Sequence, residues 1–396
     1  SSALAAVKVN ITAAANATIK IGTNAFVSGG TANFTGPVTF TVTAQDGTTV
    51  NTYTAAITAY HADTNPYGIY TAAHLNDVRN NKAGSYKMMN NIVLPARDAA
   101  GALAAGISDY ADKGWLPIAH DADGVGSFTG KFDGGNFSVD NFYINRSDLN
   151  YAGLFGRTSG AVISNTGIRG DASPAVTGSR FVGALAGFIQ GGSVTRCYAD
   201  AAVRCESHNA NVTAYAGGLL GSMIGGSLSN SYSSGNVSGA LPGNGTILYI
   251  GGLAGSLQEA NSSIRNCFAA GDINAEVSGA IRGGGLAGAL YAPTANCYAA
   301  GNVVCRGAQL TNIGALGGVI GNAAYTNSYR NSEATITVNG QPATLADASV
   351  ATPKAKTEMQ TDAFKGSLNG ASGTAWGRDG GKNDGLPYII GVGVGK

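Results

Sequence analysis

The residues of this chain that could bind zinc or carry out acid–base chemistry are few and dispersed. Its four histidines are His61, His74, His120 and His208, and no two of them are four residues apart. A zinc site needs a cluster of His, Cys or carboxylate ligands, and paired histidines one helical turn apart are its commonest helical form. The sequence therefore argues against a zinc centre.

Two acidic turns are candidate calcium sites. Asp121 and Asp123 lie in the sequence His-Asp-Ala-Asp-Gly, which matches half of a calcium loop but lacks its distal Glu. Asp379 and Asp384 lie in a second turn rich in Asp and Gly. These residue types also favour ordinary solvated turns, which is the preferred interpretation of both segments. Calcium is thus the one metal considered, and no other cofactor is expected.

The other carboxylates do not recur at one position of the chain. The ones considered for catalysis are Asp171, Asp200, Glu206, Glu259, Asp272 and Glu276. An enzyme acting on polysaccharides needs such groups held together in a cleft, so solvated edges of the fold are the favoured interpretation. The sequence has no nucleophile elbow of the Gly-x-Ser-x-Gly type and no Lys-Ser/Thr after its glycine runs. No catalytic residue is predicted.

Composition excludes further classes of protein. Charged residues make up 12% of the 396 residues, the net charge is +1, and 60 residues are glycine. Without a run of Lys and Arg there is no electrostatic footprint for nucleic acid. No apolar stretch is long enough to span a bilayer. Abundant Gly, Ser, Thr and Asn with few charges favour short strands and tight turns over helices.

A Gly-Leu-x-Gly element recurs through the central half of the chain. The first copy is Gly153–Gly156, later copies close at Gly187, Gly221, Gly255 and Gly288, and the last is a degenerate copy, Gly318-Val319-Ile320-Gly321. Successive closing glycines are 31, 34, 34, 33 and 33 residues apart. A fixed period of this length in a β-rich composition predicts a solenoid. The repeated leucines are expected to form one buried ladder: Leu154, Leu185, Leu219, Leu253 and Leu286.

A second column follows each closing glycine by about ten residues. It consists of a small residue and then an aromatic one: Cys197-Tyr198, Ser231-Tyr232, Cys267-Phe268, Cys297-Tyr298 and Ser328-Tyr329. An Asn precedes the small residue at Asn165, Asn266, Asn296 and Asn327. If the aromatic side chains point outward they form a stripe for a ligand, and if inward an interior ladder. The interior or coil-corner position is the favoured prediction.

The cysteines follow the same column. Cys197, Cys267 and Cys297 share it with serines, and Cys205 and Cys305 each lie eight residues after one of its members. A position that accepts Cys or Ser requires a small side chain. All five cysteines are therefore predicted to be buried free thiols.

The predicted fold class is all-β: a glycine-rich, β-helix-like solenoid of about six repeats with a small N-terminal β-sandwich and short helical caps. Residues 1–60 alternate with period two around Asp46-Gly47, a strong hairpin signal. Residues 61–130 are predicted to form an N-terminal cap, with a short helix from Thr71 to Asn80. The solenoid then spans 131–330, and 331–396 form a C-terminal cap, because solenoid ends must be covered.

The repeats resemble the GLUG motif of bacterial surface proteins and of IgA-specific metalloendopeptidases. The resemblance includes Gly114-Trp115-Leu116-Pro117-Ile118, the Phe132-to-Val139 segment and Asn141-Phe142-Tyr143-Ile144. It implies a cell-surface setting but no activity, and the His-Glu-x-x-His motif of the peptidases is absent. The stretch from Phe40 to Tyr53 resembles Ig-like modules of surface lipoproteins from Bacteroidetes.

Two functions are consistent with these patterns. The favoured one is a non-enzymatic secreted or cell-surface, outer-membrane-anchored module for adhesion, recognition or display. It would bind a glycan or a surface protein through an extended repeat surface, with no nucleic-acid partner. Membrane attachment would come only from an N-terminal lipid anchor outside this chain. The alternative is a polysaccharide lyase or hydrolase on a β-helix, which a groove with two facing carboxylates would favour.

Overall fold

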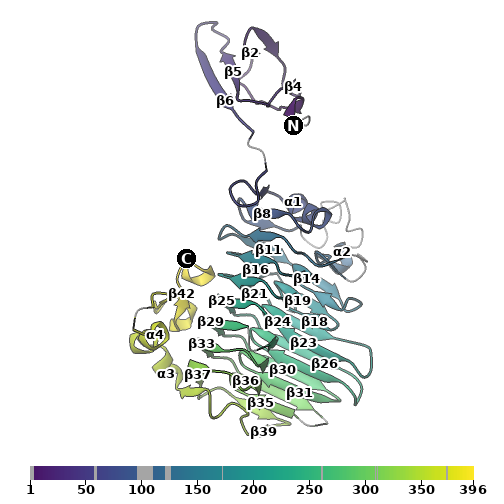
Figure 1. Ribbon diagram of the computed structural model, residues 1–396, viewed down its shortest axis with the longest axis vertical. Helices are drawn as coiled ribbons and strands as arrows, with labels where there is room; N and C mark the ends of the chain where they lie inside the picture. Colours follow the sequence, from purple (N-terminus) through teal and green to yellow (C-terminus); the bar gives the residue numbers. More distant parts are fainter. Residues whose placement is uncertain are drawn as a thin grey trace. The chain divides into compact units, whose positions relative to one another are not determined.

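The structure is a computed structural model in which strands predominate and helices are short (Figure 1). It describes residues 4–57, 60–95, 110–120, 126–171, 173–259, 262–307, 309, 311–371 and 373–396. The chain divides into two compact units, Ser1–Asn65 and Pro66–Lys396. The predicted all-β class is confirmed.

The N-terminal unit consists of short antiparallel strands around a small apolar core. β1 (Val7–Lys8) pairs with β4 (Thr31–Ala32). A four-stranded sheet has the order β3-β2-β5-β6. Its strands are β2 (Thr18–Ile21), β3 (Asn24–Phe26), β5 (Val38–Thr43) and β6 (Val50–Ala55). The buried side chains are Ile19, Ala32, Phe34, Val38 and Phe40.

The predicted hairpin at Asp46-Gly47 connects β5 to β6. Gly47 adopts a φ of 70°, a backbone conformation that glycine reaches without strain. The Asp46 carboxylate accepts hydrogen bonds from the backbone N–H of Thr48 at 2.9 Å and of Thr49 at 2.8 Å. It also accepts one from the Thr49 hydroxyl at 2.5 Å. These bonds to the charged form lower the pKa of Asp46 to about 2.

The second unit is a β-solenoid whose coils stack into four walls of mostly parallel strands (Figure 1). The first wall is a 14-stranded sheet, the second has eight strands, and the third and fourth have six each. In the first wall, early coils contribute two short strands and later coils one longer strand. The longer strands are β25 (Ser227–Ser233), β29 (Ser263–Ala269), β33 (Thr294–Ala299) and β37 (Tyr325–Asn331).

The remaining strands of the first wall are β7 (Tyr67–Ile69), β8 (Ser85–Met88), β9 (Ile92–Val93), β10 (Lys131–Asp133), β11 (Ser138–Phe142), β15 (Val162–Ser164), β16 (Gly167–Gly170), β20 (Ser193–Thr195), β21 (Tyr198–Asp200) and β40 (Thr352–Lys354). The second wall comprises β12 (Ile144–Arg146), β17 (Val176–Gly178), β22 (Val203–Glu206), β26 (Val237–Leu241), β30 (Ile273–Val277), β34 (Val303–Gly307), β38 (Ile336–Val338) and β39 (Gln341–Pro342).

The third wall comprises β13 (Tyr151–Ala152), β18 (Phe181–Val182), β23 (Thr213–Gly217), β27 (Ile247–Gly251), β31 (Ala280–Gly284) and β35 (Thr311–Gly314). The fourth comprises β14 (Phe155–Ser159), β19 (Ala186–Gln190), β24 (Leu220–Ile224), β28 (Ala254–Gln258), β32 (Ala287–Leu290) and β36 (Gly317–Ile320). Each coil therefore passes through the second, third and fourth walls before it returns to the first.

The repeated Gly-Leu-x-Gly element forms the corner between the third and fourth walls. Leu154, Leu185, Leu219, Leu253 and Leu286 are all fully buried in one core. Their backbones also bond from coil to coil, as in Leu219 N–H to Leu253 carbonyl at 2.9 Å. The closing glycines are required because the chain crosses a neighbouring coil there: a Cβ on Gly255 would lie 2.5 Å from the Gly221 carbonyl.

The register of the last copy differs from the one expected from spacing. Gly318-Val319-Ile320-Gly321 was expected to continue the element, but the Leu286 N–H bonds the carbonyl of Leu316, and Ala287 pairs with Gly317. The equivalent residues are thus Ala315 to Gly318, three positions earlier. The prediction is wrong because the connection from the fourth wall to the first is three residues shorter in this coil: Ala254 and Ile264 are ten positions apart, whereas their partners Ala287 and Thr294 are seven apart. Such connections can change length without affecting the stacked strands.

Asparagine marks the bend inside the first wall. Asn165, Asn266, Asn296 and Asn327 have φ between 46° and 55°, and Asn230 and Arg196 occupy the same position with φ of 49° and 56°. Asn tolerates this left-handed conformation better than other non-glycine residues. The asparagine side chains also bond to each other across coils, as in Asn266 Nδ2 to Asn230 Oδ1 at 3.0 Å.

The aromatic column lies on the outer side of the first wall, beneath the C-terminal segment. The preceding small residues, such as Cys197 and Cys267, point into the solenoid core. Because side chains alternate along a strand, the aromatic residues point outward: Tyr198, Tyr232, Phe268, Tyr298 and Tyr329. They are nevertheless buried. The prediction that these side chains point into the solenoid is therefore wrong, although they are shielded from solvent. The sequence pattern could not reveal which later segment covers them.

The covering segment contains α3 (Lys356–Met359), α4 (Asp362–Asn369), β41 (Trp376–Gly377) and β42 (Tyr388–Ile389). It contributes Met359, Phe364, Leu368 and Trp376 to the cluster over the aromatic column. Figure 1 shows it alongside the coils. It thus protects one wall of the solenoid over several coils.

The ends of the solenoid are closed by other residues. At the N-terminal end, α1 (Ala72–Asp77) and a 3₁₀ turn (Val78–Asn80) occupy the predicted helix, and Leu75 and Val78 are fully buried. At the C-terminal end the buried carboxylate of Asp347 accepts the backbone N–H groups of Leu316 and of Gly317, the latter at 2.9 Å. Asp347 thereby replaces the carbonyl that a further coil would supply.

Candidate functional site

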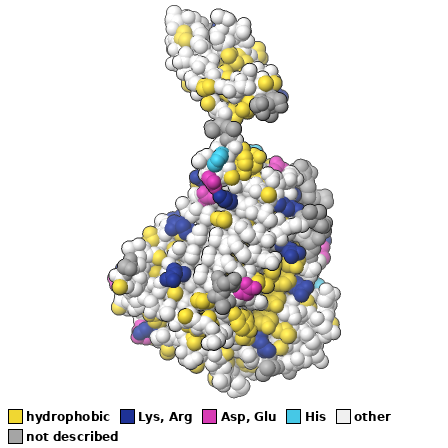
Figure 2. All heavy atoms as spheres, viewed as in Figure 1, with side chains coloured by type: hydrophobic (Ala, Val, Ile, Leu, Met, Phe, Trp, Pro, Cys, Tyr) yellow, Lys and Arg dark blue, Asp and Glu magenta, His cyan; other side chains and the backbone are white. Residues whose placement is uncertain are grey.

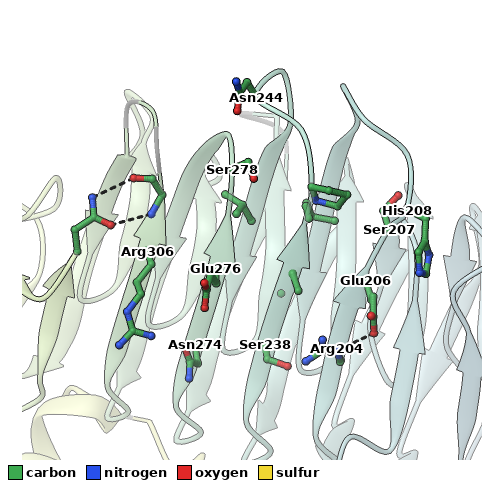
Figure 3. A pocket seen from close by; sticks show the side chains of 17 residues that line it. Arg204, Glu206, Ser207, His208, Ser238, Asn244, Asn274, Glu276, Ser278 and Arg306 are labelled. Carbon is green, nitrogen blue, oxygen red and sulfur yellow. Dashed lines mark hydrogen bonds and ion pairs between the residues drawn. The ribbon is translucent and has the colours of Figure 1, made fainter.

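A polar groove runs along the outer face of the second wall, across β22, β26, β30 and β34 (Figure 3). Its volume is about 850 Å³. The floor and rim are lined mainly by side chains that can donate or accept hydrogen bonds: Arg204, Glu206, Ser207, His208, Ser238, Asn244, Asn274, Glu276, Ser278, Arg306 and Asn339. The groove therefore offers a row of polar contacts rather than one deep pocket.

Strand register places these floor residues in two adjacent columns. One column contains Arg204, Ser238 and Asn274, because each pairs with the next across neighbouring strands. The other contains Glu206, Ala240, Glu276 and Arg306. Neighbouring strands in a sheet are about 4.8 Å apart. A ligand lying along the solenoid axis would therefore meet a new polar group at about that interval.

The two pairs of opposite charges in the groove differ in how far they compensate each other. The Nε of Arg204 lies 2.8 Å from the Glu206 carboxylate, and both side chains are about one-third exposed. Glu276 and Arg306 are neighbours in register, yet neither side chain forms a hydrogen bond or an ion pair with another residue in the described part of the chain. Their charged groups point into the groove and are available to a ligand (Figure 3).

The rim of the groove is tied together between coils. Asn339 exchanges two hydrogen bonds with the backbone of Gly307, each 3.0 Å long. The amide of Gln309 donates to the carbonyl of Asn244. These bonds connect loops that are far apart in sequence, so the rim is held in place before any ligand arrives. Preorganisation of this kind lowers the entropy lost on binding.

The structure brings together two carboxylates that the sequence analysis treated as scattered. Glu206 and Glu276 lie in the same column, two strands apart, so their backbones are separated by about 10 Å. The expectation that no acidic pair shares a column is wrong for these two, because the intervening coil has Ala240 instead. Of the other carboxylates considered, Asp171, Asp200, Glu259 and Asp272 do not line the groove.

The calcium candidates at the C-terminal turn have other partners. A carboxylate oxygen of Asp379 accepts the backbone N–H of Gly381 at 2.9 Å, and Asp384 forms an ion pair with Lys356 at 2.6 Å. Asp121 and Asp123 lie outside the described residues. Within the residues that are described, no group of three or more His, Cys, Asp or Glu side chains is placed to hold a metal ion.

The cysteines contribute to packing. All five are buried free thiols, as predicted. Burial raises the pKa of Cys197, Cys205 and Cys305 to about 12. Thiolates are the nucleophilic form of cysteine, so these residues are inert at neutral pH.

A second surface was missed by the sequence analysis. On the third wall, four aromatic residues form a half-buried stack that we call the aromatic ridge: Tyr151, Phe181, Tyr215 and Tyr249. Three of them precede a ladder leucine by four residues and Tyr151 precedes Leu154 by three. That spacing is the signal that could have identified the ridge.

The fold and these surfaces define a β-solenoid with an extended, polar ligand-accessible wall, joined to a small β-sheet unit. Comparison with known families agrees with this description. Residues 1–57 match the family "SGBP, N-terminal", the N-terminal region of surface glycan-binding proteins, and residues 248–274 match the GLUG motif. The predicted resemblance to GLUG-repeat surface proteins is therefore confirmed.

Two curated proteins share part of the sequence. A protein of Evansella cellulosilytica described as a Gly-rich membrane protein is 35% identical over 126 residues, which is 31% of this chain and 13% of that protein. Halomucin of Haloquadratum walsbyi is 32% identical over 155 residues, 38% of this chain and 2% of halomucin. The chain thus spans a small part of the length of either relative. No described helix is long and apolar enough to cross a membrane.

Proposed function

We propose that this chain is a non-enzymatic cell-surface glycan-binding protein that holds a glycan in the groove of the second wall. The observation that carries the proposal is the row of uncompensated polar groups around Asn274, Glu276 and Arg306, in a chain whose N-terminal unit matches surface glycan-binding proteins. Attachment to the outer membrane through a lipid anchor outside this chain is part of the proposal.

The groove suits a carbohydrate for three reasons. It is open and runs across several coils, so a polymer can enter and leave at both ends. Its lining has both signs of charge, with Arg204 beside Glu206 and Arg306 beside Glu276. Guanidinium groups donate hydrogen bonds to hydroxyls, carboxylates accept hydrogen bonds from them, and side-chain amides do both. Repetition at about 4.8 Å intervals permits many weak contacts, which a cell surface multiplies by avidity.

Binding can be tested by calorimetry and a glycan array with the whole chain. We expect one glycan class to bind, and Glu276→Gln and Arg306→Gln each to weaken binding about tenfold, because each loses a charged hydrogen bond. Glu259→Gln is the matched control, since Glu259 is exposed and does not line the groove. Equal affinity of all variants, or no glycan bound, would contradict the proposal.

The same preparations test the enzymatic alternative. The Glu206 and Glu276 pair is the observation that favours it, because both side chains line the groove from one column and a glycosidase needs two carboxyl groups flanking the scissile bond. Chain cleavage of a bound glycan that stops in Glu206→Gln or Glu276→Gln, while binding remains, would establish a hydrolase. Binding without release of new chain ends is the result we expect.

A further inference from the structure

The aromatic ridge on the third wall is a continuous stack of rings. The centroids of Tyr151 and Phe181 are 5.0 Å apart, those of Phe181 and Tyr215 4.9 Å, and those of Tyr215 and Tyr249 5.0 Å. The interplanar angles are 8–12°. Because the ring faces are used within the stack, the ridge presents ring edges to a ligand. Ring edges carry the positive end of the aromatic quadrupole.

Arginine side chains add full positive charges beside these ring edges. The guanidinium carbon of Arg157 lies 5.0 Å from the Tyr151 ring centroid and 5.9 Å from that of Phe188. The guanidinium carbon of Arg180 lies 5.3 Å from the Phe181 ring centroid. In the next coil Arg282 takes the place of an aromatic residue, in register with Tyr249. Stacking on a ring orients the guanidinium groups of Arg157 and Arg180. The Nε of Arg180 also donates to the carbonyl of Thr213 at 3.2 Å, which leaves its terminal N–H groups for a ligand.

No carboxylate offsets these charges within the two walls that meet at the ridge. The strands of the third and fourth walls contain no Asp or Glu, and they carry Arg157 and Arg282, with Arg180 directly before β18. Arg157 and Arg180 form no ion pair with any described residue. Their side chains are exposed. The strands of these two walls therefore carry positive charge alone, and the exposed Glu259 lies at their edge, directly after β28.

The tyrosine hydroxyls of the ridge add further hydrogen-bond donors. The hydroxyls of Tyr151, Tyr215 and Tyr249 form no hydrogen bond to another described residue. Burial raises the pKa of Tyr215, so this phenol stays protonated and can donate. Figure 2 shows hydrophobic side chains gathered where Figure 1 labels β19, β23 and β24, with Lys and Arg side chains beside them and an acidic side chain at the edge of the patch.

We infer that the aromatic ridge is a second binding site, specific for an acidic polysaccharide that lies along the solenoid axis. The arginines and phenols would bond the carboxylate groups of successive sugars, and the ring edges would contact the polymer between them. An acidic rather than a neutral chain is required because the ridge supplies donors and positive charge but hardly any acceptors. The inference is independent of the groove, whose mixed charges do not demand an anionic ligand.

The test uses the whole chain with polygalacturonate as probe and dextran as the neutral polymer. We expect polygalacturonate to bind, dextran not to bind at the ridge, and affinity for polygalacturonate to fall as salt rises from about 0.05 M to about 0.3 M. The double variant Arg157→Gln with Arg180→Gln should weaken polygalacturonate binding about tenfold, which corresponds to the loss of two exposed ion pairs.

Matched controls separate this site from general charge effects and from the groove. Lys87→Gln with Arg265→Gln removes the same two charges from exposed positions of the first wall and should leave affinity unchanged. Glu276→Gln in the groove should also leave polygalacturonate binding unchanged. A thermal melt of each variant checks folding. The inference fails if the ridge and control variants bind equally, if dextran competes fully, or if poly-glutamate binds as well as polygalacturonate.

Discussion

The phenol of Tyr298 donates a hydrogen bond to the main-chain carbonyl of Pro387 at 2.5 Å. The two residues are 89 positions apart, one in the repeat column and the other in the C-terminal segment. Tyr298 is fully buried, and the Nδ2 of Asn383 donates to its hydroxyl at 3.0 Å. The aromatic column therefore carries the polar contacts that hold the C-terminal segment on the first wall.

Replacing Tyr298 by Phe should weaken that attachment. The variant keeps the ring stack with Phe268 but leaves the Asn383 amide short of an acceptor, so we expect a loss of about 1–2 kcal/mol in the free energy of unfolding. Urea denaturation measures the change. Tyr249→Phe is the control, because the Tyr249 hydroxyl has no hydrogen-bond partner among the described residues. A loss of the same size in both variants would argue against a specific role of the Tyr298 hydroxyl.

Asp347 should be essential for closing the C-terminal end of the solenoid. Asp347→Ala leaves the backbone N–H groups of Leu316 and Gly317 buried without an acceptor, at a cost of about 2–5 kcal/mol. Asp347→Asn retains an accepting oxygen and should lose less. Denaturation of the three proteins gives the order wild type, Asn, Ala. If the alanine variant were as stable as wild type, another group would have to close the last coil.

The leucine ladder should dominate the core. Leu253 is fully buried, so Leu253→Ala should reduce stability by about 2–5 kcal/mol through lost burial and the cavity left behind. Val162 is 39% exposed on the first wall, and Val162→Ala provides the control, with a much smaller expected loss. Comparable shifts in the denaturation midpoint of both variants would be inconsistent with an inward ladder.

The thiols should be unreactive until the solenoid unfolds. The pKa of Cys197, Cys205 and Cys305 is raised to about 12 by burial, so at pH 8 only about one thiol in 10⁴ is ionised. Iodoacetamide should label none of the five cysteines in the native protein and all five in denaturant, as mass spectrometry can count. Native labelling, or fewer than five labels after unfolding without reductant, would refute the assignment.

These thiols also predict a pH dependence with a definite sign. Their folded pKa of about 12 exceeds the ordinary value of 9.0. As pH rises above 9, the unfolded chain loses these protons before the folded chain does, so stability should fall between pH 9 and about 12. A variant with Cys197, Cys205 and Cys305 changed to Ser should show a shallower decline.

Local patterns in the sequence were sufficient for several elements. Asp46-Gly47 between alternating strands predicted a hairpin, and that hairpin forms because both residues suit its turn. The apolar spacing from Thr71 to Asn80 predicted a short helix, which the Thr71 side chain caps by accepting the N–H of His74 at 3.2 Å. The Gly-Leu-x-Gly period predicted stacked coils, because only glycine permits the close crossing at Gly255 and only an apolar residue can fill the position of Leu253.

Other features depended on which parts of the chain meet in space. Periodicity identified Tyr298 as a column residue, but its outward direction and its burial follow from wall geometry and from Trp376 and Pro387, far along the chain. Glu206 and Glu276 share a column because they lie two coils apart, with Ala240 of one coil between them, which no local motif encodes. The last copy moved to Leu316 because one connection is shorter. The repeat determines which residue types each coil must contain. The face of the wall on which a side chain lies, the segment that covers it and the residues it contacts are decided only when the coils stack.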